Sequence, residues 1–204
     1  MLSLLSANPL AFLIIIAGLL VALSCHEAAH AFMAYRLGDD TPKHEGRLTL
    51  NPIAHIDPLG FLALLIFRFG WGKAVNINPN NFRHPMRDNF IVALSGPAAN
   101  LLIASVFGSM ARVVGDANVF YSIFEALTFI NVLLAIFNLI PIPPLDGSKI
   151  LGFFMSRESY YELERYGPFI LLAFLVFAST TSLPLLQTFS NAIERITLLL
   201  IGNG

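Results

Sequence analysis

His26, Glu27 and His30 stand in the order His-Glu-Ala-Ala-His, which matches the pattern H-E-x-x-H. Residues four positions apart lie on one face of a helix, so both imidazoles can bind a single Zn²⁺ ion. The glutamate between them can then reach a water molecule at that ion and act as a general base. This spacing predicts a zinc site for hydrolysis. The alternative is a polar patch between packed helices, without a metal.

The surroundings of this pattern favour the metal site. The first 25 residues carry no charged side chain, and a helix needs about 20 predominantly apolar residues to cross a bilayer. Asn8-Pro9 is typical of a helix start and Gly38 of a helix end. At 1.5 Å per residue, His26 then lies roughly 25 Å along a helix of roughly 43 Å, inside the membrane. Ionisable groups at that depth cost several kcal/mol unless they are paired or bind a metal, which makes them functional candidates.

A hydrolytic zinc site needs a third protein ligand and keeps one position open. Asp146 follows the proline-rich stretch 141–145, which must break a helix, and so lies on irregular backbone at the edge of a span. The same aspartate could instead be the N-cap of a helix that begins at Ser148. The other possible ligands are in a polar loop or on a segment typical of a solvated helix face. They are His55, Asp57, Glu158, Glu162 and Glu164.

The amino-acid composition indicates the class of protein in which these residues lie. Of 204 residues, 56% are hydrophobic and only 12% are charged, which is typical of a membrane protein. Further stretches almost free of charge run over residues 89–111, 117–140 and 166–193. We expect an all-α polytopic membrane protein with about four to six transmembrane helices around a three-helix catalytic core. One domain would cover residues 1–204, with the core at about 8–155 and C-terminal helices at 166–201.

The stretch between the first and second spans is different. Residues 46–51 and 73–78 alternate in polarity as short strands do. Between them, residues 60–69 are apolar but would be only about 15 Å long as a helix, too short to cross a bilayer. We therefore expect a small insertion with β and re-entrant character. At the other end of the chain, residues 185–201 could span the membrane or lie in its interface.

The charged residues indicate how the chain is oriented in the membrane and argue against nucleic acid as a partner. Twelve Lys and Arg residues against thirteen Asp and Glu give a net charge of −1, with no basic excess to bind nucleic acid. The single cysteine, Cys25, excludes an intramolecular disulfide framework. If the helices alternate, Arg112 is the one basic residue clearly on one side, and the other side should face the cytoplasm by the positive-inside rule. That other side would carry Arg36, Lys43, Arg47, Lys73, Arg83, Arg87, Lys149, Arg157 and Arg165.

Three motifs together resemble the site-2 protease family of intramembrane zinc metalloproteases. They are His26-Glu27-x-x-His30, Gly96-Pro97-Ala98-Ala99-Asn100, and the stretch from Asn138 through Pro143-Pro144-Leu145-Asp146-Gly147. Residues 46–52 and 55–58 resemble the short bacterial members of that family that lack a PDZ domain. The resemblance covers roughly residues 8–165. It implies a multi-pass protein of a bacterial cell (inner) membrane, with the active site toward the cytoplasm and a membrane protein or transmembrane peptide as substrate.

The resemblance also implies roles for individual residues. His26, His30 and Asp146 would bind one Zn²⁺ per chain, and Glu27 would be the general base. Asn138 would hold the substrate carbonyl or its oxyanion, and Asn100 would line the cleft. For both asparagines, a hydrogen bond between helices is the alternative, at about 1 kcal/mol.

We therefore expect a zinc metalloendopeptidase of the site-2 type, which cleaves peptide bonds in or near transmembrane segments in regulated intramembrane proteolysis. In the expected mechanism Zn²⁺ polarises the scissile carbonyl, and Glu27 activates the zinc-bound water.

The alternative from another functional class is a membrane metal-binding or carrier protein that uses the same histidines without proteolysis. Two further alternatives stay closer to the family. One is a protease whose third ligand lies among Glu158, Glu162 and Glu164, and the other is a catalytically inactive member that acts as a binding partner.

Overall fold

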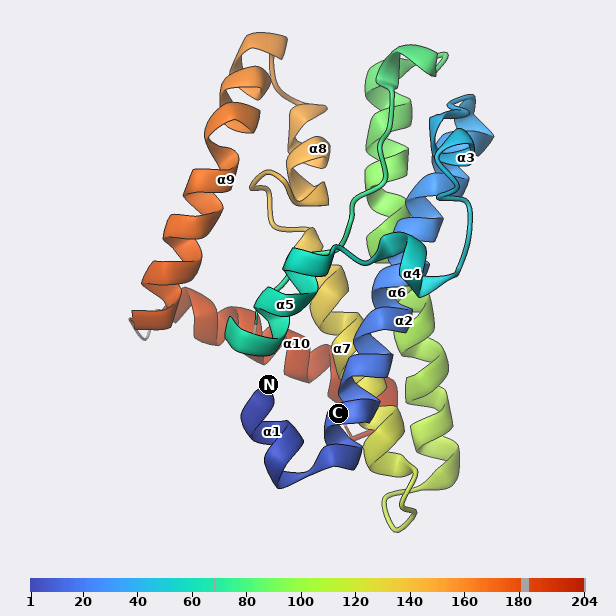
Figure 1. Cartoon of the computed structure of the whole chain (residues 1–204), viewed down its shortest axis with the longest axis vertical. Helices are drawn as coiled ribbons and strands as arrows, with labels where there is room; N and C mark the ends of the chain where they lie inside the picture. Colours follow the sequence, from blue (N-terminus) through green and yellow to red (C-terminus); the bar gives the residue numbers. More distant parts are fainter. Residues whose placement is uncertain (68, 181–183, 204) are drawn as a thin grey trace.

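The computed structural model describes residues 1–67, 69–180 and 184–203, and the regular secondary structure in these ranges is helical, without a strand. Within the described ranges, three helices are long and apolar enough to cross a membrane. They are α2 (Pro9–Leu37), α6 (Pro85–Val114) and α7 (Tyr121–Asn138), and each packs against the other two. The expected all-α fold around three long helices is confirmed (Figure 1), and three of the four to six expected spans are long and apolar enough among the described residues. A short helix, α1 (Leu2–Ala7), precedes them.

The ends of α2 form as the sequence predicts. The Asn8 side chain accepts a hydrogen bond from the backbone N–H of Ala11, at 3.1 Å, and Pro9 is the first helical residue. Gly38 ends the helix with a φ of 109°, a left-handed conformation that glycine adopts without a steric penalty. The H-E-x-x-H motif is therefore on one continuous helix of 29 residues.

The insertion between α2 and α6 contains α3 (Thr41–His44), α4 (Pro52–His55), α5 (Pro58–Phe67) and the 3₁₀ turn η1 (Pro79–Asn81). The short apolar element that the sequence indicates is α5. The expectation of β structure is wrong in detail, because residues 46–51 and 73–78 form no strand. The one bridge in the described ranges joins Ile56 and Gly72.

Side chains, not a β ladder, fix these two alternating segments. Arg47 donates from its guanidinium group to the backbone oxygens of Ala54 and Lys73. At the other end, the buried Asp39 carboxylate accepts from the backbone N–H of Asn78, at 2.8 Å, and from the side chain of Asn81, at 2.7 Å. The segment 73–78 is thus held at both ends by polar side chains, Arg47 and Asp39.

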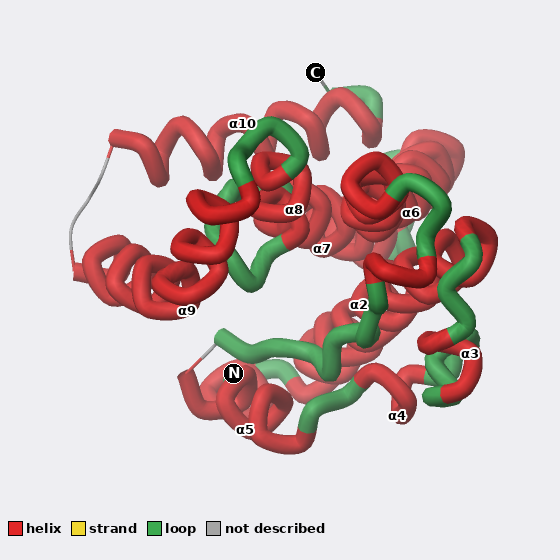
Figure 2. Tube along the Cα trace, turned by 90° about the horizontal axis from the view of Figure 1, so that it is seen from above, coloured by secondary structure: helices red, strands yellow, loops and turns green. Residues whose placement is uncertain are grey.

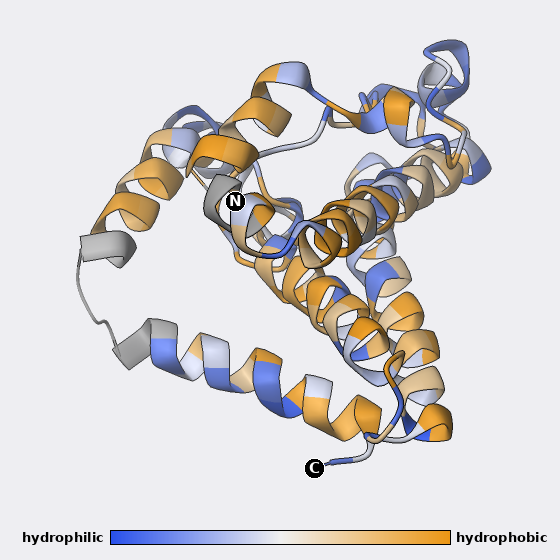
Figure 3. Ribbon diagram, turned by 60° about the horizontal axis from the view of Figure 1, so that its bottom comes forward, coloured by the Kyte–Doolittle hydropathy of each residue, from blue (hydrophilic) through white to orange (hydrophobic). Residues whose placement is uncertain are grey.

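The C-terminal part contains α8 (Asp146–Gly152), α9 (Arg157–Thr180) and α10 (Pro184–Ile201). Within the expected C-terminal helices at 166–201, residues 181–183 lie outside the described residues. Figures 1 and 2 both show α10 crossing beside α6 and α7 instead of running parallel to them. Ile193 packs there against Ala104 and Val132, and polar and apolar residues alternate along α10 (Figure 3).

Candidate metal site and cleft

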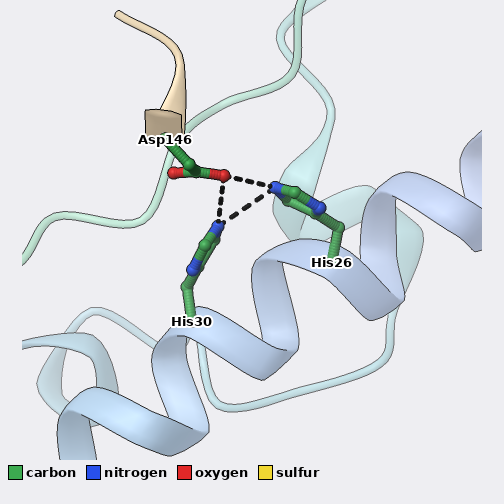
Figure 4. Close-up of side chains that lie close together, drawn as sticks. All are labelled: His26, His30 and Asp146. Carbon is green, nitrogen blue, oxygen red and sulfur yellow. Dashed lines mark hydrogen bonds and ion pairs between the residues drawn. The ribbon is translucent and has the colours of Figure 1, made fainter. Parts of the chain in front are cut away.

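The structure brings His26, His30 and Asp146 together in one buried cluster (Figure 4). The Nε2 atoms of the two histidines are 3.0 Å apart, and Asp146 Oδ2 is 3.0 Å from each of them. Both histidines come from α2, and Asp146 is the first residue of α8, directly after the irregular stretch 139–145. Asp146 thus occupies the position of a third ligand, although 116 residues separate it from His30.

The other ligand candidates lie elsewhere. His55 is buried in the insertion, with its Nε2 atom 2.9 Å from the backbone oxygen of Thr49. Asp57 accepts from the backbone N–H of Gly60, at 2.8 Å. Among the residues that the structure describes, His26, His30 and Asp146 are the one group of three or more potential ligands close enough to hold a metal ion.

Hydrogen bonds at the far side of each imidazole fix where its proton lies. His30 Nδ1 is 2.8 Å from the backbone oxygen of Val92, which can only accept, so Nδ1 carries the hydrogen. His26 Nδ1 is 2.6 Å from Asn100 Oδ1. The Asn100 amide nitrogen donates to the backbone oxygen of Ala22, at 3.1 Å, and so the amide oxygen must face His26. In the neutral imidazoles, both Nε2 atoms therefore carry lone pairs.

This arrangement fits a divalent cation. With neutral imidazoles, three acceptor atoms, two ring nitrogens and one carboxylate oxygen, converge at 3.0 Å. Buried acceptors that face one another repel unless a donor or a cation lies between them. Two histidines and a carboxylate are a ligand set for catalytic Zn²⁺, with a fourth position open for water or substrate.

Two glycines allow the ligands to pack this closely. A Cβ atom on Gly96 of α6 would lie 2.4 Å from His30 Nε2 and 2.7 Å from His26 Cε1. A Cβ atom on Gly147 would lie 2.2 Å from the backbone oxygen of Leu139, so this glycine lets the chain fold back after α7. The glycines of the two motifs are thus explained by close packing, Gly96 against the ligand imidazoles and Gly147 against the backbone that follows α7.

Glu27 faces a cavity of about 270 Å³ beside the cluster. Its Oε2 atom accepts a hydrogen bond from the backbone N–H of Val75, at 3.0 Å, which fixes the carboxylate at the cavity wall. The wall is mainly apolar and comes from α2, α5, α7, α9 and the segment after α5, which Figure 2 shows around a common centre. Apolar members of the wall are Leu19, Leu23, Phe61, Leu64, Leu134, Phe137 and Leu171.

The two asparagines of the motifs occupy different places. Asn138 lines the cavity, and its amide nitrogen donates to the backbone oxygen of Leu134, at 2.9 Å. Asn100 is fully buried and absent from the cavity wall. Its amide oxygen accepts a hydrogen bond from His26. Asn100 is therefore a hydrogen-bond partner of His26 and not part of the cavity wall.

Two further contributors have weak or no signals in the sequence. The backbone N–H of Val75 leaves no trace in a residue pattern, because every non-proline residue has one. Asn131 of α7, 1% exposed, accepts from the Asn100 amide at 3.0 Å. The available signal for Asn131 was an amide side chain in the middle of an otherwise apolar span.

Comparisons with known proteins agree with this site. The family model described as "Peptidase family M50" matches residues 109–181, a range that includes Asp146. The Bacillus subtilis protein named "Putative zinc metalloprotease YwhC" is 36% identical over 173 residues, which cover 78% of each chain. "Putative zinc metalloprotease Rip2" of Mycolicibacterium smegmatis is 36% identical over 81% of this chain and 67% of its own length.

A more distant relative is "Stage IV sporulation protein FB" of Bacillus subtilis, 29% identical over 67% of this chain and 49% of the relative. No solved structure gives a significant match.

Proposed function

The chain belongs to peptidase family M50, the family of the site-2 proteases, and we propose that it hydrolyses peptide bonds in or near the transmembrane segments of other membrane proteins. One observation carries this proposal. His26 of the ligand cluster and Glu27 both line an apolar cavity among helices that are long enough to cross a membrane. A cavity of this character suits an apolar peptide segment.

In this proposal His26, His30 and Asp146 hold one Zn²⁺ ion. The ion would supply Lewis acidity toward the scissile carbonyl and lower the pKa of water at the site toward 7. The three side chains are buried, and the hydrogen bonds at Nδ1 of each imidazole hold both Nε2 atoms toward Asp146, where these residues would hold the ion.

Glu27 acts as the general base and then as the general acid. Its Oε2 atom is engaged by the Val75 N–H, which leaves Oε1 to take a proton from the attacking water. The same carboxyl then passes the proton to the leaving amine. The position of Glu27 one residue after His26 on α2 keeps base and ligand in a fixed relation.

Asn138 stabilises the charge that develops on the substrate oxygen. One hydrogen of its amide group is donated to Leu134, so the second remains for a substrate carbonyl. A donor placed where charge develops in the transition state is usually a large contribution to catalysis.

The substrate segment would reach the site along an apolar path. A second cavity, of about 870 Å³, shares wall residues with the cavity at Glu27, so the two lie against each other. The shared residues include Leu19, Leu64, Phe69, Leu134 and Phe137. A helix shields its own amides, so the substrate must unwind locally before attack.

We place the site toward the cytoplasm of a bacterial cell membrane, from the positions of the basic residues.

The test compares zinc content and cleavage of a model transmembrane substrate for the purified full chain and three variants. Glu27→Gln should keep zinc and lose cleavage, because the ligands remain and the base is gone. Asp146→Ala should lose zinc affinity. Glu158→Gln, at the exposed start of α9, serves as the matched control and should change neither quantity.

Full cleavage by Glu27→Gln would contradict the mechanism. Metal transport by the wild-type protein without proteolysis would favour a carrier instead.

A further inference from the structure

A line of hydrogen bonds runs from the backbone of α7 to the first metal ligand. The Asn131 amide nitrogen donates to the backbone oxygen of Leu127, at 2.8 Å. Asn131 Oδ1 accepts from the Asn100 amide nitrogen, at 3.0 Å, and Asn100 Oδ1 lies 2.6 Å from His26 Nδ1. Asn100, Asn131 and His26 are at most 3% exposed, so water does not compete for these bonds.

The direction of this line is fixed at its start. A backbone carbonyl can only accept, so the Asn131 nitrogen must point to Leu127 and its oxygen must point to Asn100. That oxygen in turn requires the nitrogen of Asn100, which leaves the Asn100 oxygen for His26. His26 must then donate from Nδ1 and keep the lone pair on Nε2, as a metal ligand needs.

A flip of the Asn100 amide shows what Asn131 adds. After a flip, the Asn100 oxygen would face two acceptors, the Asn131 oxygen and the backbone oxygen of Ala22. The Asn100 nitrogen would face His26 and favour the tautomer with hydrogen on Nε2, which cannot bind a metal. The backbone oxygen of Ala22 and the side-chain oxygen of Asn131 are thus the two groups that oppose a flip of the Asn100 amide.

We infer that Asn131 is a positioning residue of the metal site, which acts through Asn100 to hold His26 in its metal-binding tautomer. The inference rests on the metal site of the proposed function and is independent of which substrate is cleaved. If part of the protein holds His26 in the tautomer that cannot bind Zn²⁺ through Nε2, the apparent Zn²⁺ affinity falls in proportion to the fraction that remains able to bind. The effect of Asn131 is therefore measurable as a change in Zn²⁺ affinity.

A neighbouring residue separates this role from helix packing. Thr128 lies one turn earlier on α7, is also fully buried, and donates from its hydroxyl group to the backbone oxygen of Phe124, at 2.7 Å. Among the hydrogen bonds of the described residues, none joins Thr128 to Asn100 or His26. Thr128→Val thus removes a buried polar group from the same helix without touching the line to His26.

The experiment measures the affinity of the purified, full-length, metal-free protein for Zn²⁺ by competition with a chelator, with no substrate present. Asn131→Leu keeps the size of the side chain and removes both hydrogen bonds. We expect it to lower Zn²⁺ affinity about tenfold, the lower end of the range for residues that orient metal ligands. Thr128→Val should bind Zn²⁺ as the wild type does.

Asn131→Thr tests rescue, because a threonine hydroxyl can donate to Leu127 and accept from Asn100. It should recover most of the lost affinity. In parallel, the ¹⁵N chemical shifts of the His26 imidazole should report hydrogen on Nδ1 in the wild type and a mixture of tautomers in Asn131→Leu.

The outcomes are distinct. Wild-type affinity in Asn131→Leu, or an equal loss in Asn131→Leu, Asn131→Thr and Thr128→Val, would overturn the inference. A wild-type protein that binds no Zn²⁺ would instead overturn the proposed function. Loss of cleavage without loss of affinity in Asn131→Leu would also contradict a role through His26.

Discussion

The two sides of the site are built differently. The metal side consists of side chains on or next to the long helices, and each ligand histidine has its Nδ1 atom engaged by a partner on α6. The base side depends on the insertion, where an extended segment brings the Val75 N–H to Glu27. That segment is held at one end by Arg47 and at the other by Asp39.

This difference teaches that metal binding and base positioning can be separated. The ligands depend on contacts among α2, α6, α7 and α8, whereas the partner of the base depends on loop anchors outside the spans. A change on the metal side should therefore lower zinc affinity. A change on the base side should lower the turnover rate with zinc still bound, and any substitution that moves both quantities equally would break the comparison.

The largest effect is expected from Gly96→Ala. The added methyl group would lie 2.4 Å from His30 Nε2, closer than van der Waals contact permits, so ligand geometry must shift. We expect Zn²⁺ affinity to fall more than about 100-fold, with cleavage lost in parallel. Isothermal titration with Zn²⁺ measures this.

Gly108→Ala is the matched control for Gly96→Ala. It is on the same helix, and its methyl group would lie 2.9 Å from Leu200 of α10, away from the ligands. It should change thermal stability and leave Zn²⁺ affinity within about twofold of the wild type. An equal loss of affinity in both variants would show that packing of α6 in general, and not access to the imidazoles, decides metal binding.

A second change on the metal side is Asn100→Leu. It removes the acceptor for His26 Nδ1 and should lower Zn²⁺ affinity about 10- to 100-fold, more than any change at Asn131. Asn138→Leu is the comparison, because the Asn138 amide donates to the backbone oxygen of Leu134 and has no hydrogen bond to a ligand among the described residues. It should keep zinc and lower the turnover rate if it holds the substrate oxygen. Zinc loss in Asn138→Leu and none in Asn100→Leu would reverse the two assignments.

The base side is tested by Val75→Pro. Proline has no N–H, so Glu27 loses its backbone partner while the zinc ligands are untouched. A hydrogen bond worth about 1.4 kcal/mol corresponds to a tenfold lower turnover rate. Val75→Ala keeps the N–H and should retain most activity. Steady-state cleavage with zinc content measured on the same samples decides between the two outcomes, and a loss of zinc in Val75→Pro would argue against separate sides.

The smallest effect concerns Asp39 and pH. Burial would raise the pKa of this carboxyl, but hydrogen bonds from Thr41, Asn78 and Asn81 outweigh it and hold the pKa below the ordinary 3.8. A lowered pKa in the folded state means that the stabilisation is complete above the unfolded value and is lost as the pH falls through the folded value. Residues 73–82 should therefore resist proteolysis at pH 5 and become more susceptible below about pH 3.8.

Asp39→Asn supplies the comparison for that pH effect. It cannot titrate, so its susceptibility to an acid-active protease should change little across the same pH interval. Zinc affinity at neutral pH should stay near the wild-type value, because Asp39 lies outside the ligand contacts. If proteolytic susceptibility depended on pH in the same way in the wild type and in Asp39→Asn, titration of Asp39 would not be the cause of the pH effect.

The sequence predicted the parts of the site that depend on local geometry. His26, Glu27 and His30 follow from helical periodicity alone, since one helix fixes their mutual positions. Asp146 was one of six possible third ligands, because its approach to α2 depends on how the chain reverses after α7. The reversal is set by close packing at Gly147, which no residue spacing reports.

The insertion was predicted less well for a related reason. Alternating polarity identified residues 73–78 as extended, but a strand needs a partner, and here Arg47 and Asp39 take the place of one. The Val75 N–H could not be predicted at all, because its importance comes from its position beside Glu27. Asn131 was visible as a polar residue in a span, but only the structure connects it to Asn100 and His26.

The carbonyl group of Val92 makes the two histidines unequal as targets of mutation. It is a main-chain atom, so substitution at position 92 leaves the partner of His30 in place. His26 relies on a side chain, and substitution at position 100 changes its partner directly. Position 100 is therefore the position at which a substitution can be used to alter metal preference. An acidic residue there would make the His26 ring more basic, while His30 would keep a constant ligand strength across the series.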